Sequence, residues 1–261
     1  MTAEEIVARV LYRDALMLVI DKPVGFAVHK GPKGGESLED HFGALRFGLP
    51  RAPALAHRLD RDTSGCLVLG RHRKALAELG RLFKTGRIGK TYWAVVAGGP
   101  SEEEGRIELP LGRKDATRGW WMKHDPAGQP AATTWTVLGR SAAMTAPELA
   151  AAGAGREESG RAGDPGGKPH HLTWLALEPL TGRTHQLRVH CAAMGWPILG
   201  DTIYSGAPRA GGRGLHLHAR EVVVPLYKNR GAIRVSAPVP PHMEAALRAC
   251  GWSGDASRTA D

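Results

Sequence analysis

The sequence predicts an α+β fold built around a mixed, mainly antiparallel β-sheet with flanking helices and loops. Short apolar or alternating segments recur along the chain between Gly, Pro and polar residues, as is typical of strands. Helical periodicity is confined to a few segments between these predicted strands. The 261 residues, 42% of them hydrophobic, are enough to bury a substantial core.

The first predicted elements are two buried strands separated by a long irregular region. Residues 15–25 (ALMLVIDKPVG) predict a short strand that stops at Pro23 and Gly25. Residues 26–54 are rich in Gly and Pro, and one helix is expected among them at 37–47 (SLEDHFGALRF). Residues 65–71 (GCLVLGR) form a run too apolar for a strand that faces water, so a second buried strand is expected there.

A helix and a third strand follow. Residues 72–86 (HRKALAELGRLFKTG) place leucines at helical spacing, and Gly86 is suited to end that helix. Residues 87–98 (RIGKTYWAVVAG) are rich in β-branched and aromatic residues and predict a strand. Because side chains alternate along a strand, one face should carry Ile88, Lys90, Tyr92, Ala94 and Val96.

The remaining elements are further strands and two short helices. Two or three antiparallel strands are expected within 106–138, and others at 171–180 (HLTWLALEPL) and 219–226 (AREVVVPL). One helix is expected after the turn at 181–183, with Thr184 as its cap and Gly195 at its end. A last helix is expected to start at Pro240 or Pro241.

We expect residues 1–261 to form a single domain with its core at about 12–252. Residues 141–170 are dominated by Ala, Gly, Pro and charge, and no strand pattern fits them. The segments on either side resemble strands of one sheet, so a flexible insertion is expected there. The tail 253–261 is expected to be frayed.

The charge balance suits a polyanionic partner. The chain carries 35 Lys and Arg against 26 Asp and Glu, a formal charge of +9. This excess favours nucleic acid as a partner, although an ordinary basic enzyme would have the same balance.

The cysteines and the N-terminus predict a cytoplasmic protein. Cys66, Cys191 and Cys250 lack metal-type spacing, and the first two lie in apolar surroundings, which indicates reduced core thiols. The N-terminal segment is acidic and carries no signal-like apolar run, and no run is long enough to span a bilayer. His216 and His218 alternate on one segment without an acid or thiol in ligand spacing, so no metal site is expected.

A polar loop precedes the second buried strand. Residues 56–71 (AHRLDRDTSGCLVLGR) gather two acids, two arginines and two hydroxyls before an apolar run. Asp60 and Asp62 would suit acid–base chemistry, or one of them a nucleophile. The same side chains would also suit a purely structural loop in which they bind backbone donors.

A second group of polar residues that suits a functional site lies at 181–190 (TGRTHQLRVH). Arg183 follows a Thr-Gly turn at the start of a predicted helix. An arginine held at such a corner could pair with a carboxylate from another loop and keep that carboxylate ionised, or it could simply face solvent.

Five motifs occur in one order along the chain: HRLDRDTSG, KTYWAVVAG, LTGRTHQLRVH, PILGDTIY and LHLHA. Together they resemble the RluA family of RNA pseudouridine synthases, from about Val19 to about Pro241. The resemblance implies the pseudouridine synthase fold and the isomerisation of uridine in RNA, without a cofactor or a metal. Many such proteins carry a small RNA-binding domain before the catalytic one, and we expect none here.

The resemblance also assigns the catalytic residues. Asp60 matches the essential aspartate, which either attacks the ribose anomeric carbon as a nucleophile or abstracts a proton to give a glycal. Arg183 matches its partner. Tyr92 matches the tyrosine that stacks on the target base and takes part in moving a proton.

Other residues are predicted to bind RNA. Arg58 matches the arginine that fills the helix stack once the base is flipped out, since flipping leaves an unstacked gap. Leu187 is a candidate apolar wall for the base pocket. Further contacts are expected from His57, Arg61, Lys90 and Lys123. A group of basic residues lies between the loop and Tyr92: Arg71, Arg73, Lys74, Arg81, Lys84, Arg87 and Lys90. Either phosphate contacts or a merely solvated helix face would explain these residues.

The expected partner is an rRNA or tRNA stem-loop, bound by a monomer. Two other hypotheses stay open at this point. A glycosidic-bond hydrolase would use Asp60 and Asp62 as paired carboxylates, but it leaves Tyr92 and the 181–190 motif unexplained. A non-catalytic RNA-binding module would not need the complete set of Asp60, Tyr92 and Arg183.

Overall fold

The computed structural model describes residues 1–31, 34–114, 121–144, 171–205 and 214–255. Most of the predicted insertion and tail lies outside these residues. The chain divides into two compact units, one of residues 1–91 and 218–237 and the other of residues 92–217 and 238–261. We call them unit 1 and unit 2 and describe each by itself. The predicted single domain stays a prediction.

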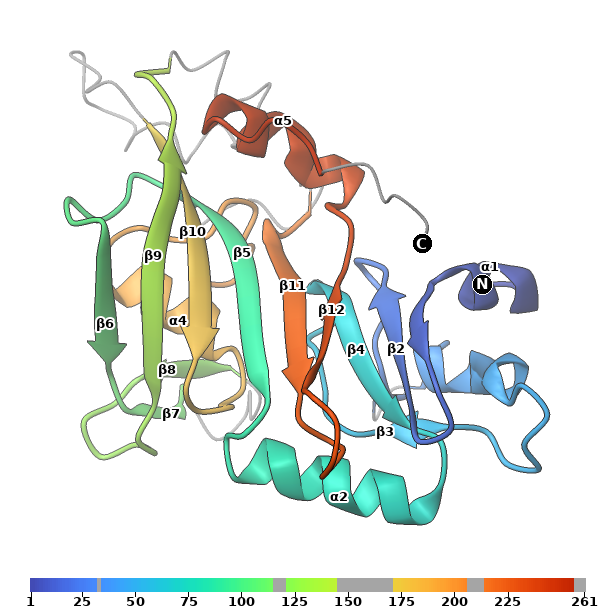
Figure 1. Cartoon of the computed structure of the whole chain (residues 1–261). Helices are drawn as coiled ribbons and strands as arrows, with labels where there is room; N and C mark the ends of the chain where they lie inside the picture. The colour runs from blue at the N-terminus through green and yellow to red at the C-terminus, as the bar shows by residue number, and fades with distance from the viewer. Residues whose placement is uncertain (32–33, 115–120, 145–170, 206–213, 256–261) are drawn as a thin grey trace. The chain divides into compact units, whose positions relative to one another are not determined.

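Unit 1 contains a mixed sheet (Figure 1). Its central strands are β2 (Met17–Lys22) and β4 (Ser64–Gly70), which pair antiparallel with Leu18 opposite Leu69. On either side lie β1 (Val10–Arg13), antiparallel to β2, and β11 (Leu217–Val224), parallel to β4. Two short strands complete the unit: β3 (Ala54–Leu55) pairs with β4, and β12 (Ile233–Ser236) pairs with β11.

Three helices accompany this sheet: α1 (Ala3–Ala8), η1 (Leu38–Leu45) and α2 (Arg73–Lys84). The helix expected at 37–47 is present as the 3₁₀ helix η1. The predicted end of the next helix is confirmed, because α2 stops before Gly86, whose φ of 67° is a conformation that glycine adopts readily.

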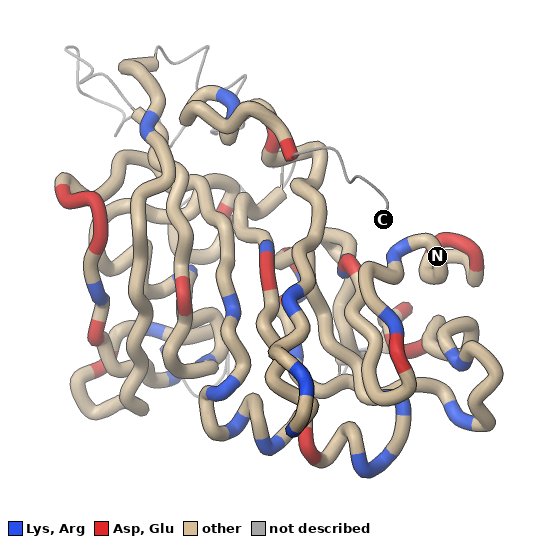
Figure 2. The backbone as a smooth tube through the Cα atoms, viewed as in Figure 1, with Lys and Arg blue, Asp and Glu red and all other residues tan. Residues whose placement is uncertain are grey.

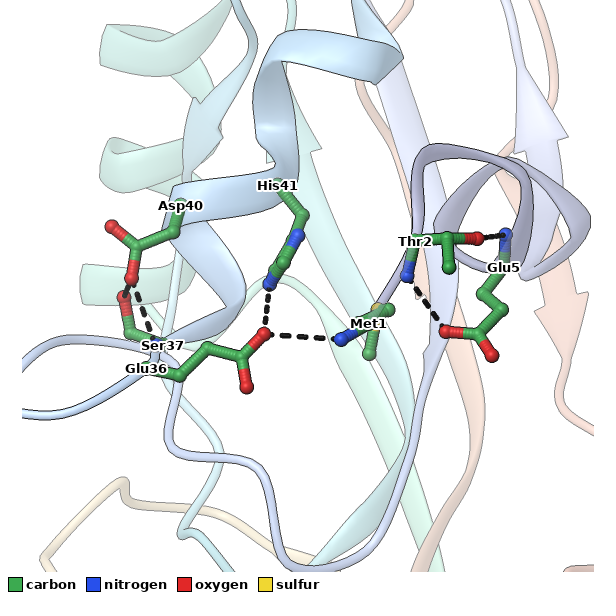
Figure 3. A network of polar contacts seen from close by, with 7 residues as sticks. All are labelled: Met1, Thr2, Glu5, Glu36, Ser37, Asp40 and His41. Atoms are coloured by element: carbon green, nitrogen blue, oxygen red, sulfur yellow. Dashed lines mark hydrogen bonds and ion pairs between the residues drawn. The ribbon is translucent and has the colours of Figure 1, made fainter.

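Capping boxes start the two N-terminal helices (Figure 3). Thr2 Oγ1 accepts a hydrogen bond from the backbone N–H of Glu5, whose carboxylate accepts one from the Thr2 N–H in return. Ser37 and Asp40 make the corresponding pair at η1. Glu36 joins the two helices, since Oε1 lies 3.0 Å from the Met1 ammonium and 2.7 Å from His41 Nε2 (Figure 3).

The core of unit 1 packs α2 against its strands. Leu79 and Leu82 of α2 are fully buried with Val19 of β2, Val68 of β4 and Val222 of β11. Burying such side chains stabilises the unit by about 1.5–3 kcal/mol each. β4 is buried along its whole length, as its apolar composition predicts.

Unit 2 is built on an antiparallel sheet in the order β5 (Gly89–Ala97), β10 (Leu172–Pro179), β9 (Ala132–Arg140) and β6 (Glu104–Glu108). A separate hairpin pairs β7 (Leu111–Arg113) with β8 (Met122–His124). The helices among the described residues of this unit are α4 (Gln186–Ala193) and α5 (Pro241–Ala249). Among the described strand pairs only β4 with β11 is parallel, which confirms the predicted fold class.

Strand β5 separates two apolar clusters of unit 2. Tyr92, Ala94 and Val96 pack with Leu177 and Leu187 on one face. On the other face, Trp93 and Val95 pack in a cluster that includes helix α5. The predicted alternation is thus confirmed from Tyr92 to Val96, whereas Ile88 precedes β5 and packs in the core of unit 1.

The start of α4 differs from the prediction. The helix begins at Gln186, after His185, so Thr184 is not its cap. His185 adopts a left-handed conformation with φ of 53°, and its side chain makes no cap hydrogen bond to the helix. The predicted end of α4 and start of α5 are confirmed, since α4 ends before Gly195 with φ of 84° and α5 begins at Pro241. Among the described residues, no helix is long and apolar enough to cross a membrane.

Candidate active site

The predicted nucleophile lies on the loop that connects β3 to β4 in unit 1. Asp60 is half-buried between the buried Leu59 and the exposed Arg61. The Thr63 N–H donates to the Asp60 carbonyl at 3.2 Å and closes a tight turn around Asp62. Asp60 therefore projects from a short turn that enters a fully buried strand.

Gly65 allows this turn to lie directly against β11. Its φ is 101°, and a Cβ there would come within 2.3 Å of the Ala219 carbonyl oxygen. Both facts require glycine at this position. The glycine of the DTSG sequence thus sets how the Asp60 loop enters the sheet.

Lys22 is the main polar support of the loop and was not among the predicted site residues. It ends β2, and its side chain is fully buried. Its ammonium donates to the carbonyl oxygens of Pro23 at 2.9 Å, Arg61 at 2.8 Å and Thr63 at 2.8 Å. Three N–H groups thus meet three carbonyls, two of them from the residues that flank Asp62.

The charge of Lys22 is set by opposing effects. Burial lowers its pKa to about 7, while Asp62, Asp60 and Asp21 act to raise it. The lysine is therefore electrostatically coupled to the predicted nucleophile. A backbone bond adds to the same support, because the Gly25 N–H also donates to the Arg61 carbonyl, at 3.0 Å.

The other predicted residues of this loop have different surroundings. Arg58 is exposed, as an RNA-contacting residue would be. Arg61 is exposed too, and its Nε donates to the Gly25 carbonyl at 2.8 Å. Arg61 therefore also helps to fix the loop.

His57 has a structural role in unit 1. Its Nε2 accepts a hydrogen bond from the Val68 N–H at 3.0 Å, and its ring stacks on Phe83 with centroids 4.3 Å apart. Burial, with a smaller effect of the Lys90 charge, lowers the pKa of His57 to about 3. These contacts give a neutral His57 side chain a structural role, and an RNA contact of His57 stays a prediction.

A buried polar pair stabilises the start of β4. Ser64 Oγ lies 2.9 Å from His218 Nδ1 on β11, and both residues are almost completely buried. His218 thus belongs to the sheet interior. No group of three or more His, Cys, Asp or Glu side chains among the described residues is arranged to hold a metal ion.

Arg183 lies on the turn before α4 in unit 2, and its side chain is exposed. Its Nε donates to the Pro130 carbonyl at 3.2 Å. Its backbone N–H donates to Gln186 Oε1 at 3.0 Å, and the same oxygen accepts from Thr181 Oγ1 at 2.7 Å. Gln186, the first residue of α4, therefore fixes the turn that carries Arg183.

A network behind this turn holds His185 in its left-handed conformation. His185 Nδ1 lies 2.8 Å from the hydroxyl of Tyr204, which accepts a hydrogen bond from the Met122 N–H at 3.1 Å. Arg188 makes a buried bidentate pair with Asp201 at 2.8 and 2.7 Å. Asp201 Oδ1 also accepts from the Tyr204 N–H at 3.1 Å, so the turn at 181–185 rests on a buried polar frame.

The remaining predicted residues of unit 2 are divided between interior and surface. Tyr92 is half-buried on β5, and Leu187 is 6% exposed in the same apolar cluster. Lys123 is exposed on β8, 3.8 Å from Asp125. The structure brings Tyr92 and Leu187 together in one cluster, while the pairing of Asp60 with Arg183 stays a prediction.

Comparisons with known proteins find relatives over most of this chain. A family model described as RNA pseudouridylate synthase matches residues 16–193. An uncharacterised RNA pseudouridine synthase of Zymomonas mobilis is 36% identical over 89% of this chain and 94% of its own length. The ribosomal large subunit pseudouridine synthase C of Vibrio cholerae is 31% identical over 91% of this chain and 68% of its own.

A solved structure shares the fold. The human RNA pseudouridylate synthase domain containing 1 has a TM-score of 0.68 with 26% identity, covering 94% of this chain and 89% of that protein. The family match spans the Asp60 loop, Tyr92 and Arg183.

Proposed function

Since this chain belongs to the RNA pseudouridylate synthase family and isomerises uridine in RNA to pseudouridine, we propose that Asp60 is its nucleophile and that Tyr92 and Arg183 complete its catalytic set. The observation that carries the proposal is the support of the Asp60 loop. A fully buried ammonium fixes the carbonyls of Arg61 and Thr63, so the carboxylate is held on a rigid turn. Such fixed placement is what a nucleophile needs for reaction without reorganisation.

The proposed chemistry is a displacement followed by its reversal at another ring atom. The Asp60 carboxylate attacks the ribose anomeric carbon, and the bond to uracil N1 breaks with its electron pair moving to the base. The uracil turns, and its C5 attacks the same carbon and releases Asp60. Loss of the C5 proton then restores the aromatic ring, and N1 gains a proton, so no atom is added or removed.

Each remaining residue has a proposed part in this sequence. Tyr92 stacks on the uracil and takes part in the proton transfer from C5. Arg183 is the proposed partner of the catalytic aspartate, because a planar guanidinium suits bidentate pairing with a carboxylate. Arg58 fills the gap left by the flipped nucleotide, because unstacking a base costs a few kcal/mol.

Release of tritium tests the reaction. Wild-type protein is incubated with RNA labelled with tritium at uridine C5, and label in water, free uracil and chain length are measured. Isomerisation releases label while the RNA stays intact and no uracil is freed. Free uracil would instead support a glycosidic-bond hydrolase, and RNA binding without release would support a non-catalytic module.

We further propose that the substrate is a stem-loop of rRNA or tRNA and that the protein acts as a monomer in the cytoplasm. The name of the Vibrio cholerae relative, a ribosomal large subunit enzyme, supports rRNA as the first candidate. The three free cysteines, all buried, support a reducing compartment. Mapping pseudouridines in cells with and without this protein tests the substrate, and sedimentation equilibrium tests the monomer.

A further inference from the structure

We propose that a basic surface at one end of unit 1 binds the phosphates of an RNA helix at a distance from the target uridine. The inference rests on the proposed function and adds a second RNA contact to it. We call this surface the basic end. It consists of exposed cations from four segments: Arg13; Arg46 and Arg51; Arg73, Lys74, Arg81, Lys84 and Arg87; and Lys228 and Arg230.

Arg71 holds three of these segments together. One terminal nitrogen of its guanidinium donates to the Asp14 carbonyl at 2.5 Å, and the other donates to the carbonyl oxygens of Arg46 at 3.1 Å and Phe47 at 3.4 Å. Its backbone N–H donates to the Leu16 carbonyl. A single half-buried arginine therefore joins the β1–β2 turn, the segment after η1 and the start of α2.

The fourth segment is attached through the same turn. The Tyr227 hydroxyl donates to the Asp14 carboxylate, which also accepts from Tyr12 at 2.7 Å. The hydrogen bond from Arg81 is the main cause that lowers the pKa of Glu78 of α2, and the nearby charge of Lys228 adds a smaller effect. Figure 2 shows Lys and Arg gathered along α2 and in the turn between β11 and β12.

Few acids oppose these cations. Glu78 is paired with Arg81 at 2.7 Å, and Asp14 is occupied by two tyrosine hydroxyls and two backbone N–H groups. The exposed large apolar side chains of the described residues are Val7, Val24, Leu138, Leu180 and Met194, and none belongs to the basic end. A membrane-inserting or protein-docking face would be expected to expose such side chains, whereas phosphate binding needs only the charge.

Phe47 shows that this surface is built in a fixed conformation. Its φ is 44°, which is unusual for a bulky residue, and the Arg13 guanidinium lies 4.3 Å from its ring centroid. The cation–π contact and the two bonds from Arg71 hold the segment in this strained form. Arg13 and Arg46 are thus placed before RNA arrives.

The basic end is separated from the predicted nucleophile by the length of β4. Asp60 precedes the strand, and α2 follows it. The seven residues Ser64–Gly70 span about 20 Å at roughly 3.3 Å per residue. The contact must therefore fall on a helix that flanks the target uridine.

The test compares two triple variants of equal charge. Arg73→Gln, Lys74→Gln and Lys84→Gln remove cations of the basic end. Lys30→Gln, Arg106→Gln and Arg248→Gln remove three exposed cations that are paired with acids elsewhere, and serve as the control. Affinity for a long-stemmed RNA hairpin, and for the same loop without its stem, is measured as a function of salt concentration. Any hairpin serves, because phosphate contacts do not read sequence.

Loss of three phosphate contacts should reduce the slope of log affinity against log salt by about 2.7 for the long-stemmed hairpin. From about 50 to about 200 mM salt, affinity would then change about 40-fold less than in the wild type. The control variant and the stemless loop should show the wild-type slope. A wild-type slope for the basic-end variant, or an equal loss with the stemless loop, would overturn the proposal. Weaker binding to anionic lipid vesicles with unchanged RNA binding would do so too. Binding needs no turnover, so failure to isomerise uridine would overturn the proposed function separately.

Discussion

Replacing Lys22 by methionine tests whether its three hydrogen bonds hold Asp60 in its reactive position. The change keeps an unbranched side chain in the buried site and removes the ammonium. Lys22 thus acts as a positioning residue, since it touches backbone carbonyls of the loop. We expect a fall in kcat of about 100-fold, the effect of displacing a reacting group by about 1 Å.

The structure also gives the expected effect on stability. Each bond from the charged amine contributes about 1.5–3 kcal/mol, so about 4.5–9 kcal/mol is lost with the three. Against this, a pKa lowered from 10.5 to about 7 corresponds to a burial cost of about 5 kcal/mol, which methionine does not incur. The two effects largely offset each other, and the folded protein should survive the substitution.

The assay measures steady-state rates of tritium release at varied RNA concentration, together with thermal unfolding. Lys22→Met should lower kcat with little change in KM, because the fully buried Lys22 side chain makes no proposed contact with RNA. Lys30→Met, at an exposed lysine paired with Asp40, is the control and should leave both parameters unchanged. A folded Lys22→Met protein with kcat within twofold of the wild type would refute the positioning role.

Three further predictions follow from the same contacts. Because the folded state releases the Lys22 proton near pH 7 and the unfolded state near its ordinary pKa of 10.5, the unfolded state binds more protons between these values. The contribution of Lys22 to the free energy of unfolding should therefore increase with pH over that range. Denaturant titrations of Lys22→Met at several pH values should lack this increase. Gly65→Ala should destabilise the protein by more than about 2 kcal/mol, since its Cβ meets the Ala219 carbonyl at a positive φ; an unchanged denaturation midpoint would contradict this. Gln186→Leu removes the acceptor of the Arg183 and Thr181 hydrogen bonds and should cost about 1–3 kcal/mol with reduced kcat; wild-type kcat would show that Gln186 does not position Arg183.

Local chemistry made many features of the fold predictable. Gly86, Gly195 and Pro241 mark helix boundaries because each favours a backbone conformation found there. The alternation along β5 follows from the pleat of a strand. The candidate catalytic residues were found by their motifs.

Features that depend on distant contacts were not predictable in this way. The bond from Lys22 to Thr63 joins residues 41 positions apart, and only an isolated lysine at the end of an apolar strand hinted at it. His57 stands among charged residues, so the stacking of its ring on Phe83 of α2 could not be foreseen from its neighbours in the sequence. The left-handed His185 depends on Tyr204 and displaced Thr184 from the predicted cap.

The central claim is that Asp60 performs the chemistry. Its most direct test is tritium release by Asp60→Asn, with Asp62→Asn as the matched control in the same loop. We predict that Asp60→Asn binds RNA as the wild type does but lowers the rate of release by more than about 10⁴-fold, while Asp62→Asn still turns over. Release by Asp60→Asn at a rate near that of the wild type would contradict the assignment.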